Sequence, residues 1–227
     1  MKIAVAKGDG IGPEIMAGVL QIFEANKVPL EYEYIDMGKW VFDKGFSNGM
    51  TPEAKQSIEN LGLLFKGPME TPKGKGVKSI NVTARKTWNT YANKRVFQSL
   101  HGVDTVFSKA GIPIDITIVR ENIEDTYGGV EHMLTHDVAL SRRFITRPGS
   151  LQLIHYAFEI ARQKHARRIT CGHKSNIMKL TDGLFLECFY EVAKDYPELK
   201  ADDVIVDDLC MKLVTRPDSF DVVVLTN

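Results

Sequence analysis

The chain has 227 residues, enough for one large or two small domains, and its 44% hydrophobic content is ordinary for a soluble globular protein. Lys+Arg and Asp+Glu both number 29, so the formal net charge is zero and gives no global reason to expect nucleic acid or a membrane as a partner. No apolar run reaches the ~18–20 residues of a membrane span, and the N-terminus turns polar too early for a signal peptide. The three cysteines are widely spaced without zinc spacing, which favours reduced thiols in the cytosol.

In the first half of the chain, short apolar runs alternate with segments of helical spacing. Residues 3–6 form an apolar run ended by Gly8-Asp9-Gly10, which predicts a buried strand. Pro13 then opens a helix to about Ala25, because a missing N–H costs nothing at the first helical position. Further predicted elements are a strand at 30–35, a helix with Thr51 as N-cap and Pro52 at its first position, a strand at 63–65, a Gly/Lys-rich loop at 71–77 and a helix at 83–91.

The second half repeats this alternation. Predicted strands cover 114–119, 168–171, 204–206 and 221–225, predicted helices cover 150–165, 181–194 and 207–214, and 127–147 is predicted to be extended. Alternating strands and helices predict an α/β protein with substantial parallel pairing. A helix normally covers each strand of such a sheet, and none follows 221–225, so we expect a chain that stops in the middle of a fold.

Arginines and small polar residues recur at defined spacing in the middle of the chain. The pattern is Ser79-x-Asn81-x3-Arg85, then Arg95, then Arg120-Glu-Asn-x-Glu-Asp-x-Tyr ending at residue 127. An arginine fork binds a carboxylate at two points, so three of them suit a substrate with two or three carboxylates. Taken singly, each arginine is more typical of a solvated surface charge. The serine and the asparagine, taken singly, are each more typical of a helix cap. Only the joint spacing favours a substrate site.

Three further residues could carry chemistry. Lys174 follows a predicted strand, at the kind of position where open α/β sheets place their chemistry, and a lysine among apolar groups and cations can act as a base. Tyr127 could deliver a proton to a developing enol carbon. Asp207, with Asp208, could bind a hard divalent cation or simply cap the following helix. The alternatives for Lys174 and Tyr127 are a surface lysine and a packed aromatic side chain.

A phosphate-binding loop is excluded at Gly8-Asp9-Gly10-Ile11-Gly12-Pro13-Glu14. The dinucleotide fingerprint needs G-x-G-x-x-G and the P-loop needs Gly-Lys-Ser/Thr, and neither pattern occurs there. Pro13 also removes an N–H that a phosphate would use. A strand–turn–helix connection accounts for the segment.

These blocks, in this order, resemble the decarboxylating isocitrate dehydrogenases of the isocitrate/isopropylmalate dehydrogenase family. The 79–127 pattern is similar to the family's substrate pattern, 8–14 to its opening signature, 67–72 to its Gly-Pro…Thr-Pro segment, and 174–179 to its Lys-x-Asn-Ile-Met-Lys motif. The resemblance implies an α/β, isopropylmalate-dehydrogenase-like fold. Residues 1–90 would belong to an incomplete large domain, 91–124 and 147–227 to a smaller α/β domain, and 125–146 to a clasp that joins two subunits.

The resemblance also implies a function. It is the NADP-dependent oxidative decarboxylation of isocitrate to 2-oxoglutarate in the tricarboxylic acid cycle, with Mg²⁺ or Mn²⁺, in a cytoplasmic homodimer with shared active sites. The residues implied are Tyr127 and Lys174 as catalytic, Ser79, Asn81, Arg85, Arg95 and Arg120 as substrate-binding, Thr71 and Asn176 as cofactor-binding, and Asp207 as a metal ligand. Lys174 and Asp207 would enter the neighbouring subunit's site. Lys174 would assist removal of the hydroxyl proton, and Tyr127 would protonate the enolate.

Some alternatives stay open. Val96 stands where the family usually has a proline after the arginine that corresponds to Arg95. The choice between NAD and NADP is made in a part of the family sequence that does not occur here. The cofactor loop and the remaining metal aspartates are missing too, so we expect the 227-residue polypeptide alone to be inactive. It could instead be a non-catalytic fragment or regulatory subunit, or a relative acting on homoisocitrate, isopropylmalate or tartrate. Ser79 and Asn81 argue against isopropylmalate, whose pocket needs an apolar wall.

Overall fold

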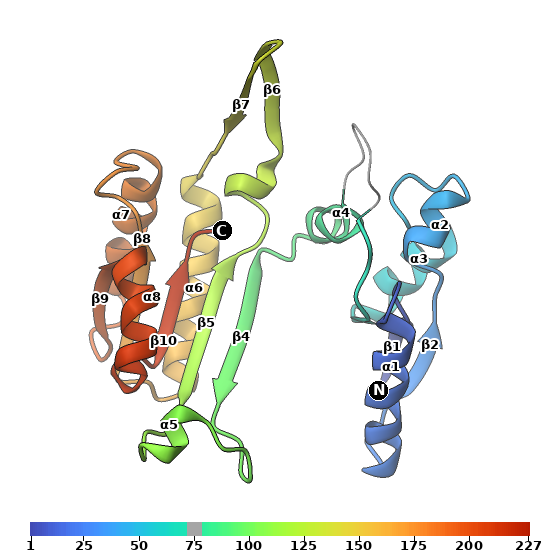
Figure 1. Cartoon of the computed structure of the whole chain (residues 1–227), viewed down its shortest axis with the longest axis horizontal. Coiled ribbons are helices and arrows are strands. Elements are labelled where there is room, and N and C mark those ends of the chain that lie inside the picture. The colour runs from blue at the N-terminus through green and yellow to red at the C-terminus, as the bar shows by residue number, and fades with distance from the viewer. Residues whose placement is uncertain (72–78) are drawn as a thin grey trace. The chain divides into compact units, whose positions relative to one another are not determined.

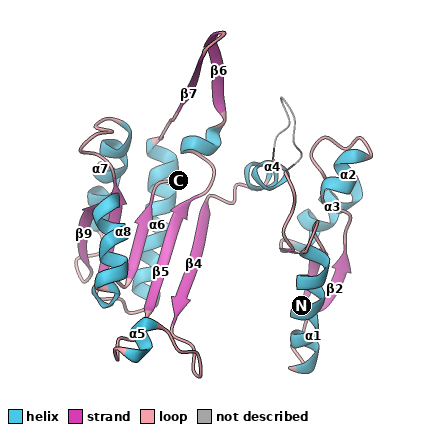
Figure 2. Cartoon of the chain, viewed as in Figure 1, coloured by secondary structure: helices cyan, strands magenta, loops and turns pink. Residues whose placement is uncertain are grey.

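The computed structural model describes residues 1–71 and 79–227, so most of the predicted loop at 71–77 lies outside the described residues. The chain divides into two compact units, Met1–Trp88 and Asn89–Asn227 (Figure 1). Both units contain parallel strands and helices (Figure 2), as the alternation in the sequence predicts. The finer division at 90, 124 and 146 stays a prediction.

The first unit is built on a three-stranded parallel sheet in the order β2–β1–β3. The strands are β1 (Lys2–Ala6), β2 (Glu31–Tyr34) and β3 (Leu64–Lys66), and the helices are α1 (Gly12–Ala25), α2 (Lys39–Asp43), α3 (Pro52–Leu61) and α4 (Ile80–Thr87). The central strand β1 is buried from Ile3 to Ala6, as an apolar strand with neighbours on both sides should be.

Helix α4 begins earlier and ends earlier than the predicted helix at 83–91. Ile80 and Ala84 are both buried and lie one turn apart, and the half-buried Trp88 continues this stripe. They pack in a cluster that includes Met37 and Met50. The polar residues between them hid this stripe in the sequence.

Helix α3 has the N-terminus that the sequence predicts. Thr51 Oγ1 accepts a hydrogen bond from the backbone N–H of Ala54 at 3.1 Å, and Pro52 occupies the first helical position. We expect Thr51→Ala to lower the free energy of unfolding by about 1 kcal/mol, measured by urea denaturation, because this N–H loses its partner. Thr87→Ala is the control: its exposed hydroxyl only bonds back to Thr83 O, so an equal loss there would contradict the capping role.

The second unit is built on a five-stranded sheet in the order β4–β5–β10–β8–β9. Strand β4 is antiparallel to β5, and the other four strands are parallel (Figure 1). Its elements are β4 (Ala92–Gln98), α5 (Val106–Lys109), β5 (Asp115–Glu121), α6 (Arg147–Gln163), β8 (Arg168–His173), α7 (Thr181–Ala193), β9 (Lys200–Ile205), α8 (Val206–Thr215), the 3₁₀ turns η1 (Asp125–Gly128) and η2 (Pro217–Ser219), and β10 (Val222–Leu225).

Alternation along β5 decides which side chains meet which helix. Val119 packs with the buried faces of α6 and α7, whereas Ile116 packs with Leu209 of α8. Helices α6 and α7 therefore lie on one face of the sheet and α8 on the other. Arg120 alternates with Val119, so it shares the α8 face with Ile116 and Ile118.

The segment predicted to be extended contains an antiparallel hairpin of β6 (Val130–Thr135) and β7 (Val138–Arg142), whose residues are all exposed. The prediction was wrong at both ends, because Tyr127 and Gly128 belong to the 3₁₀ turn η1 and α6 already begins at Arg147, capped by Thr146. A role of the hairpin as a clasp between subunits stays a prediction. None of the helices in the described part of the chain is long and apolar enough to cross a membrane.

Candidate active site

Several predicted site residues of the second unit lie at the C-terminal ends of its parallel strands. The strands β5, β10, β8 and β9 all end on this side of the sheet, and open α/β sheets bind their ligands there. Arg120 is the penultimate residue of β5, Lys174 follows β8, Asn227 lies two residues beyond β10, and Asp207 is the second residue of α8, after β9.

Arg120 and Tyr127 lie together. The guanidinium carbon of Arg120 is 5.6 Å from the centre of the Tyr127 ring, a cation–π geometry. Arg120 Nη2 also donates a hydrogen bond to Asn227 Oδ1, while Asn227 Nδ2 donates to Glu124 O at 3.1 Å. Asn227 thus joins the arginine to the segment before the tyrosine. The sequence analysis did not single it out, because no local spacing relates it to Arg120.

Arg95 and Arg120 lie on the same face of the sheet. Asn93 is directly opposite Arg120 in the antiparallel pair, and Arg95 is opposite Ile118, so these side chains share one face. Arg95 Nε donates to Asn93 Oδ1 at 3.1 Å. Asn93 therefore belongs to the polar surface around the two arginines. Asn93 and Arg95 are two residues apart, a spacing that places them on one face of a strand. The sequence did not predict β4, so this spacing was not used.

The residues between Arg120 and Tyr127 shape the chain rather than face a ligand. Glu121 accepts hydrogen bonds from the backbone N–H groups of Ile123 and Glu124 at 2.7 and 2.9 Å, and Asn122 donates to Thr90 O at 2.8 Å. Burial raises the pKa of Glu121 above its usual value, against the effect of these backbone donors. The motif thus consists of two outward-facing ends and a buried middle.

Lys174 and Asp207 form an ion pair between the loop after β8 and the first turn of α8. Because β8 and β9 are adjacent, the two side chains meet although they are far apart in sequence. The hydrogen bond from Lys174 lowers the pKa of the Asp207 carboxyl. The backbone N–H of Lys174 donates to Asp182 Oδ2 at 2.6 Å. Asn176 lies exposed in the same loop.

In the first unit, Ser79 and Asn81 lie at the start of α4 and Arg85 lies in its last turn. Ser79 occupies the N-cap position, but its side chain makes no capping hydrogen bond and instead accepts one from Thr71 Oγ1 at 3.2 Å. Asn81 Nδ2 donates to Met69 O at a long 3.4 Å, and its buried Oδ1 has no hydrogen-bond partner among the residues that the structure describes. Asn81 and Arg85 are four residues apart, on one side of the helix.

Lys66, at the end of β3, was not named by the sequence analysis. Burial lowers its pKa below the usual lysine value, the nearby positive charge of Arg85 lowers it further, and Asp9 opposes both. Two cations are therefore held close together beside α4. Such a concentration of positive charge suits an anionic ligand.

The loop of Gly8, Asp9 and Gly10 is structural. Both carboxylate oxygens of Asp9 accept from the N–H of Lys39, at 2.9 and 2.8 Å, and one accepts from the N–H of Glu70 at 3.0 Å. Gly8 has φ +83°, and a Cβ there would lie 2.1 Å from Pro68 O. An acidic side chain fills this loop, consistent with the exclusion of a phosphate-binding loop.

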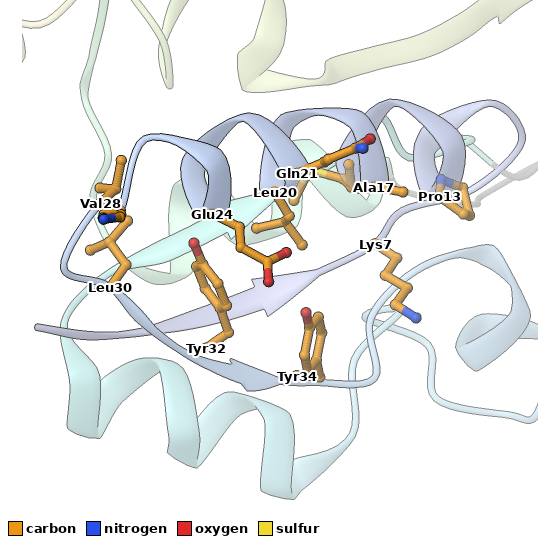
Figure 3. A pocket seen from close by; sticks show the side chains of 12 residues that line it. Lys7, Pro13, Ala17, Leu20, Gln21, Glu24, Val28, Leu30, Tyr32 and Tyr34 are labelled. Atoms are coloured by element: carbon orange, nitrogen blue, oxygen red, sulfur yellow. The ribbon is translucent and has the colours of Figure 1, made fainter.

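A groove of about 730 Å³ lies between α1 and β2 (Figure 3), and none of the ten predicted site residues lines it. Its lining carries two lysines, Lys7 and Lys27, and one glutamate, Glu24, and Lys7 Nζ lies 5.4 Å from the centre of the Tyr34 ring. Because no predicted site residue lines the groove, we assign the chemistry to the strand ends.

The described part of the chain shows no assembled cluster of metal ligands. Among residues 1–71 and 79–227, no group of three or more His, Cys, Asp or Glu side chains is placed to hold a metal ion. Asp207 is exposed and engaged by Lys174, so it offers one carboxylate where a divalent cation needs several oxygen ligands.

Comparison with known proteins agrees with this fold and these motifs. Residues 2–227 match the model of the family described as isocitrate/isopropylmalate dehydrogenase, so the chain belongs to that family. It is 44% identical over 99% of its length to an isocitrate dehydrogenase [NADP] of Thermus thermophilus, and covers 45% of that protein. It is also 44% identical over 97% of its length to a chloroplastic 3-isopropylmalate dehydrogenase of Solanum tuberosum, and covers 60% of it.

Solved structures give the same result. A crystal structure of a protein from Thermus thermophilus superposes with a TM-score of 0.94 at 43% identity, covering 100% of this chain and 45% of that protein. The α/β, isopropylmalate-dehydrogenase-like fold expected from the motifs is therefore confirmed. The chain spans about half the length of the curated isocitrate dehydrogenases it matches.

Proposed function

We propose that this chain is the N-terminal portion of an NADP-dependent isocitrate dehydrogenase that converts isocitrate to 2-oxoglutarate. The observation that carries the proposal is the polar start of α4. Asn81 Oδ1 is a buried acceptor without a hydrogen-bond partner among the described residues, and a buried acceptor left unpaired is costly. The atom is covered in the present structure, so a substrate hydroxyl would satisfy it once the covering side chains move aside. An isopropyl group could not, so this position favours a hydroxy tricarboxylate.

The three arginines account for the negative charge of such a substrate. We assign carboxylate binding to Arg85 on α4 and to Arg95 and Arg120 on the β4–β5 pair, with Ser79 and Asn81 as neutral hydrogen-bonding groups. A guanidinium presents paired donors that match a carboxylate, and three arginines match three carboxylates. Thr71 and Asn176 are assigned to the cofactor, since both are exposed polar residues next to assigned substrate or catalytic residues.

Two side chains are assigned the proton transfers. Lys174 helps to remove the proton of the substrate hydroxyl, and Tyr127 protonates the product carbon after CO₂ is lost. The ion pair between Lys174 and Asp207 has to open before the amine can accept a proton. NADP, when bound, supplies the hydride acceptor. For Mg²⁺ or Mn²⁺, Asp207 is the one ligand that we assign to this chain.

We also propose a cytoplasmic homodimer with shared active sites. The exposed hairpin β6–β7 carries Met133 and Leu134 at 60% and 61% exposure, and exposed apolar side chains of this size favour contact with a partner. Lys174 and Asp207 would then serve the partner's site. The three cysteines are free, as expected in a reducing compartment.

An assay of the full-length protein with NADP and NAD against isocitrate, homoisocitrate, 3-isopropylmalate and tartrate tests the function. Isocitrate should give the highest kcat/KM, and NADP should be the better cofactor. The runner-up is 3-isopropylmalate, because the Solanum tuberosum relative matches this chain at the same identity as the Thermus thermophilus one. A preference for 3-isopropylmalate would overturn the assignment of Ser79 and Asn81.

Arg120→Lys should weaken the binding of isocitrate. Lysine keeps the charge but loses the planar fork, so we expect a loss of about 1.5–3 kcal/mol, or a roughly ten- to hundredfold rise in KM. Steady-state kinetics measure it, with Arg162→Lys as control, because Arg162 is an exposed arginine paired within its own helix. An unchanged KM for Arg120→Lys would count against Arg120 as a carboxylate ligand.

A further inference from the structure

A buried ion cluster joins the two segments that carry the proton-transfer residues of the second unit. Arg143, directly after β7, donates from Nε to Asp125 Oδ1 at 2.5 Å and from Nη2 to Asp125 Oδ2 at 2.6 Å. The same Nη2 lies 2.8 Å from Asp182 Oδ1. This second contact is an ion pair only, because Asp182 Oδ1 receives no hydrogen bond within the described part of the chain. Both carboxylates are 1% exposed.

One arm of the cluster leads to Tyr127. Asp125 lies two residues before it and has φ +65°, an unfavourable backbone conformation for a residue other than glycine. The conformation is held from both sides, since the Asp125 N–H donates to Phe144 O at 3.0 Å while its carboxylate is gripped by Arg143. Gly128 packs so closely on the Phe144 ring that a Cβ would lie 2.2 Å from it. The turn η1 is therefore fixed on residues 143–144.

The other arm leads to Lys174. Asp182 lies in the first turn of α7, where a negative charge is favourable, and its Oδ2 accepts the backbone N–H of Lys174 at 2.6 Å. Arg143 lies against the other oxygen, Oδ1, and its positive charge offsets the negative charge of Asp182. Burial lowers the pKa of Arg143, but Asp125 and Asp182 outweigh that effect and raise it, so the guanidinium stays charged. The loop that carries Lys174 is thus anchored to the same cation as the turn that carries Tyr127.

We propose that Arg143 is a positioning residue that, through Asp125 and Asp182, holds Tyr127 and Lys174 in the geometry that their proton transfers require. The roles of Tyr127 and Lys174 rest on the proposed function, and the shared anchor rests on the contacts alone. Removal of the guanidinium leaves two buried carboxylates without their cation, which disfavours the present arrangement of both segments. A displacement of about 1 Å at a catalytic group can reduce a rate about a hundredfold.

The first test compares Arg143→Gln with Arg147→Gln in the full-length protein. Arg147 also holds two carboxylates, Glu187 and Glu191, but on the exposed surface between α6 and α7. We expect Arg143→Gln to lower kcat about 10- to 100-fold with less than about a threefold change in KM, and Arg147→Gln to leave both unchanged. Arg143→Lys keeps the charge, so it should fold and recover part of the loss. Equal kcat values for both glutamine variants would overturn the proposal.

A double-mutant cycle separates positioning from general destabilisation. Arg143→Gln added to Tyr127→Phe should lower kcat by a clearly smaller factor than it does in the wild type, because only the part of the loss that passes through Lys174 remains. A purely structural role would give the same fold-loss in both backgrounds. Full additivity, at temperatures far below thermal unfolding of each variant, would refute the action through Tyr127.

Hydrogen exchange tests the anchor without any activity. In Arg143→Gln, and to a smaller extent in Arg143→Lys, the amides of Lys174 and of residues 125–128 should exchange at least about tenfold faster than in Arg147→Gln. If they do so in a protein that does not oxidise isocitrate, the proposed function is wrong and the anchor stands. If they exchange at the control rate, the anchor is wrong, whatever the substrate.

Discussion

Ser79→Asp in the full-length protein should abolish the binding of isocitrate while the fold stays intact. Ser79 stands at the N-cap of α4, and its hydroxyl contacts Thr71 rather than the helix backbone. An aspartate there would face the carboxylates that we assign to Arg85 on the same helix, and like charges at close range cost several kcal/mol. Aspartate is itself a favourable N-cap residue, so the helix should not be weakened.

Isothermal titration with isocitrate, beside circular dichroism, measures this effect. Ser79→Ala is the matched control, since it removes the hydroxyl without adding charge and should retain measurable affinity. If the aspartate variant binds isocitrate as tightly as the alanine variant, then Ser79 does not face the substrate. The placement of the substrate site at the start of α4 would then be wrong.

Lys174→Met should lower kcat by about 10²- to 10⁴-fold, the range typical of a lost general acid or base, with little change in KM. Methionine is similar in length and removes the amine. The fold should be unaffected, because Lys174 contacts Asp207 in an exposed ion pair and its own backbone N–H to Asp182 is retained.

Lys194→Met is the control, because Lys194 is a lysine at the C-terminus of α7, away from the assigned site residues. Its kinetics should match the wild type. A Lys174→Met variant with wild-type kcat would remove Lys174 from the proton transfer.

Helix starts could be predicted from the sequence where capping chemistry marks the boundary. Pro13 and the pair Thr51 and Pro52 placed the starts of α1 and α3 to within a residue, because proline geometry and a side-chain cap act locally. Strand β4 was missed, since Asn93, Lys94 and Arg95 give it the charged composition of an edge strand rather than an apolar run. The short helices α2 and α5 were missed too, because four or five residues hold too little periodic signal.

The candidate site was recognised in part. Local spacing singled out Arg120 and Tyr127, which do lie against each other. It did not distinguish the buried Glu121 and Asn122 between them, whose partners are backbone groups of the turn and of Thr90. No local spacing pointed to Asn227 or to Lys66. Asn227 contacts Arg120 because of the strand order, and Lys66 is a buried cation influenced by the charge of Arg85.

The alternation of strands and helices and the capped start of α3 can be predicted from the sequence alone, since both depend on residues within one or two turns of each other. Which distant residues meet depends on the assembled fold. β10 pairs with β5 and β8, and β8 pairs with β9, so Asn227 reaches Arg120, Lys174 reaches Asp207, and the intervening segments fold back to bring Arg143 to Asp182. Strand order arises from burial of whole apolar faces, a property of the assembled sheet that no short window of residues contains.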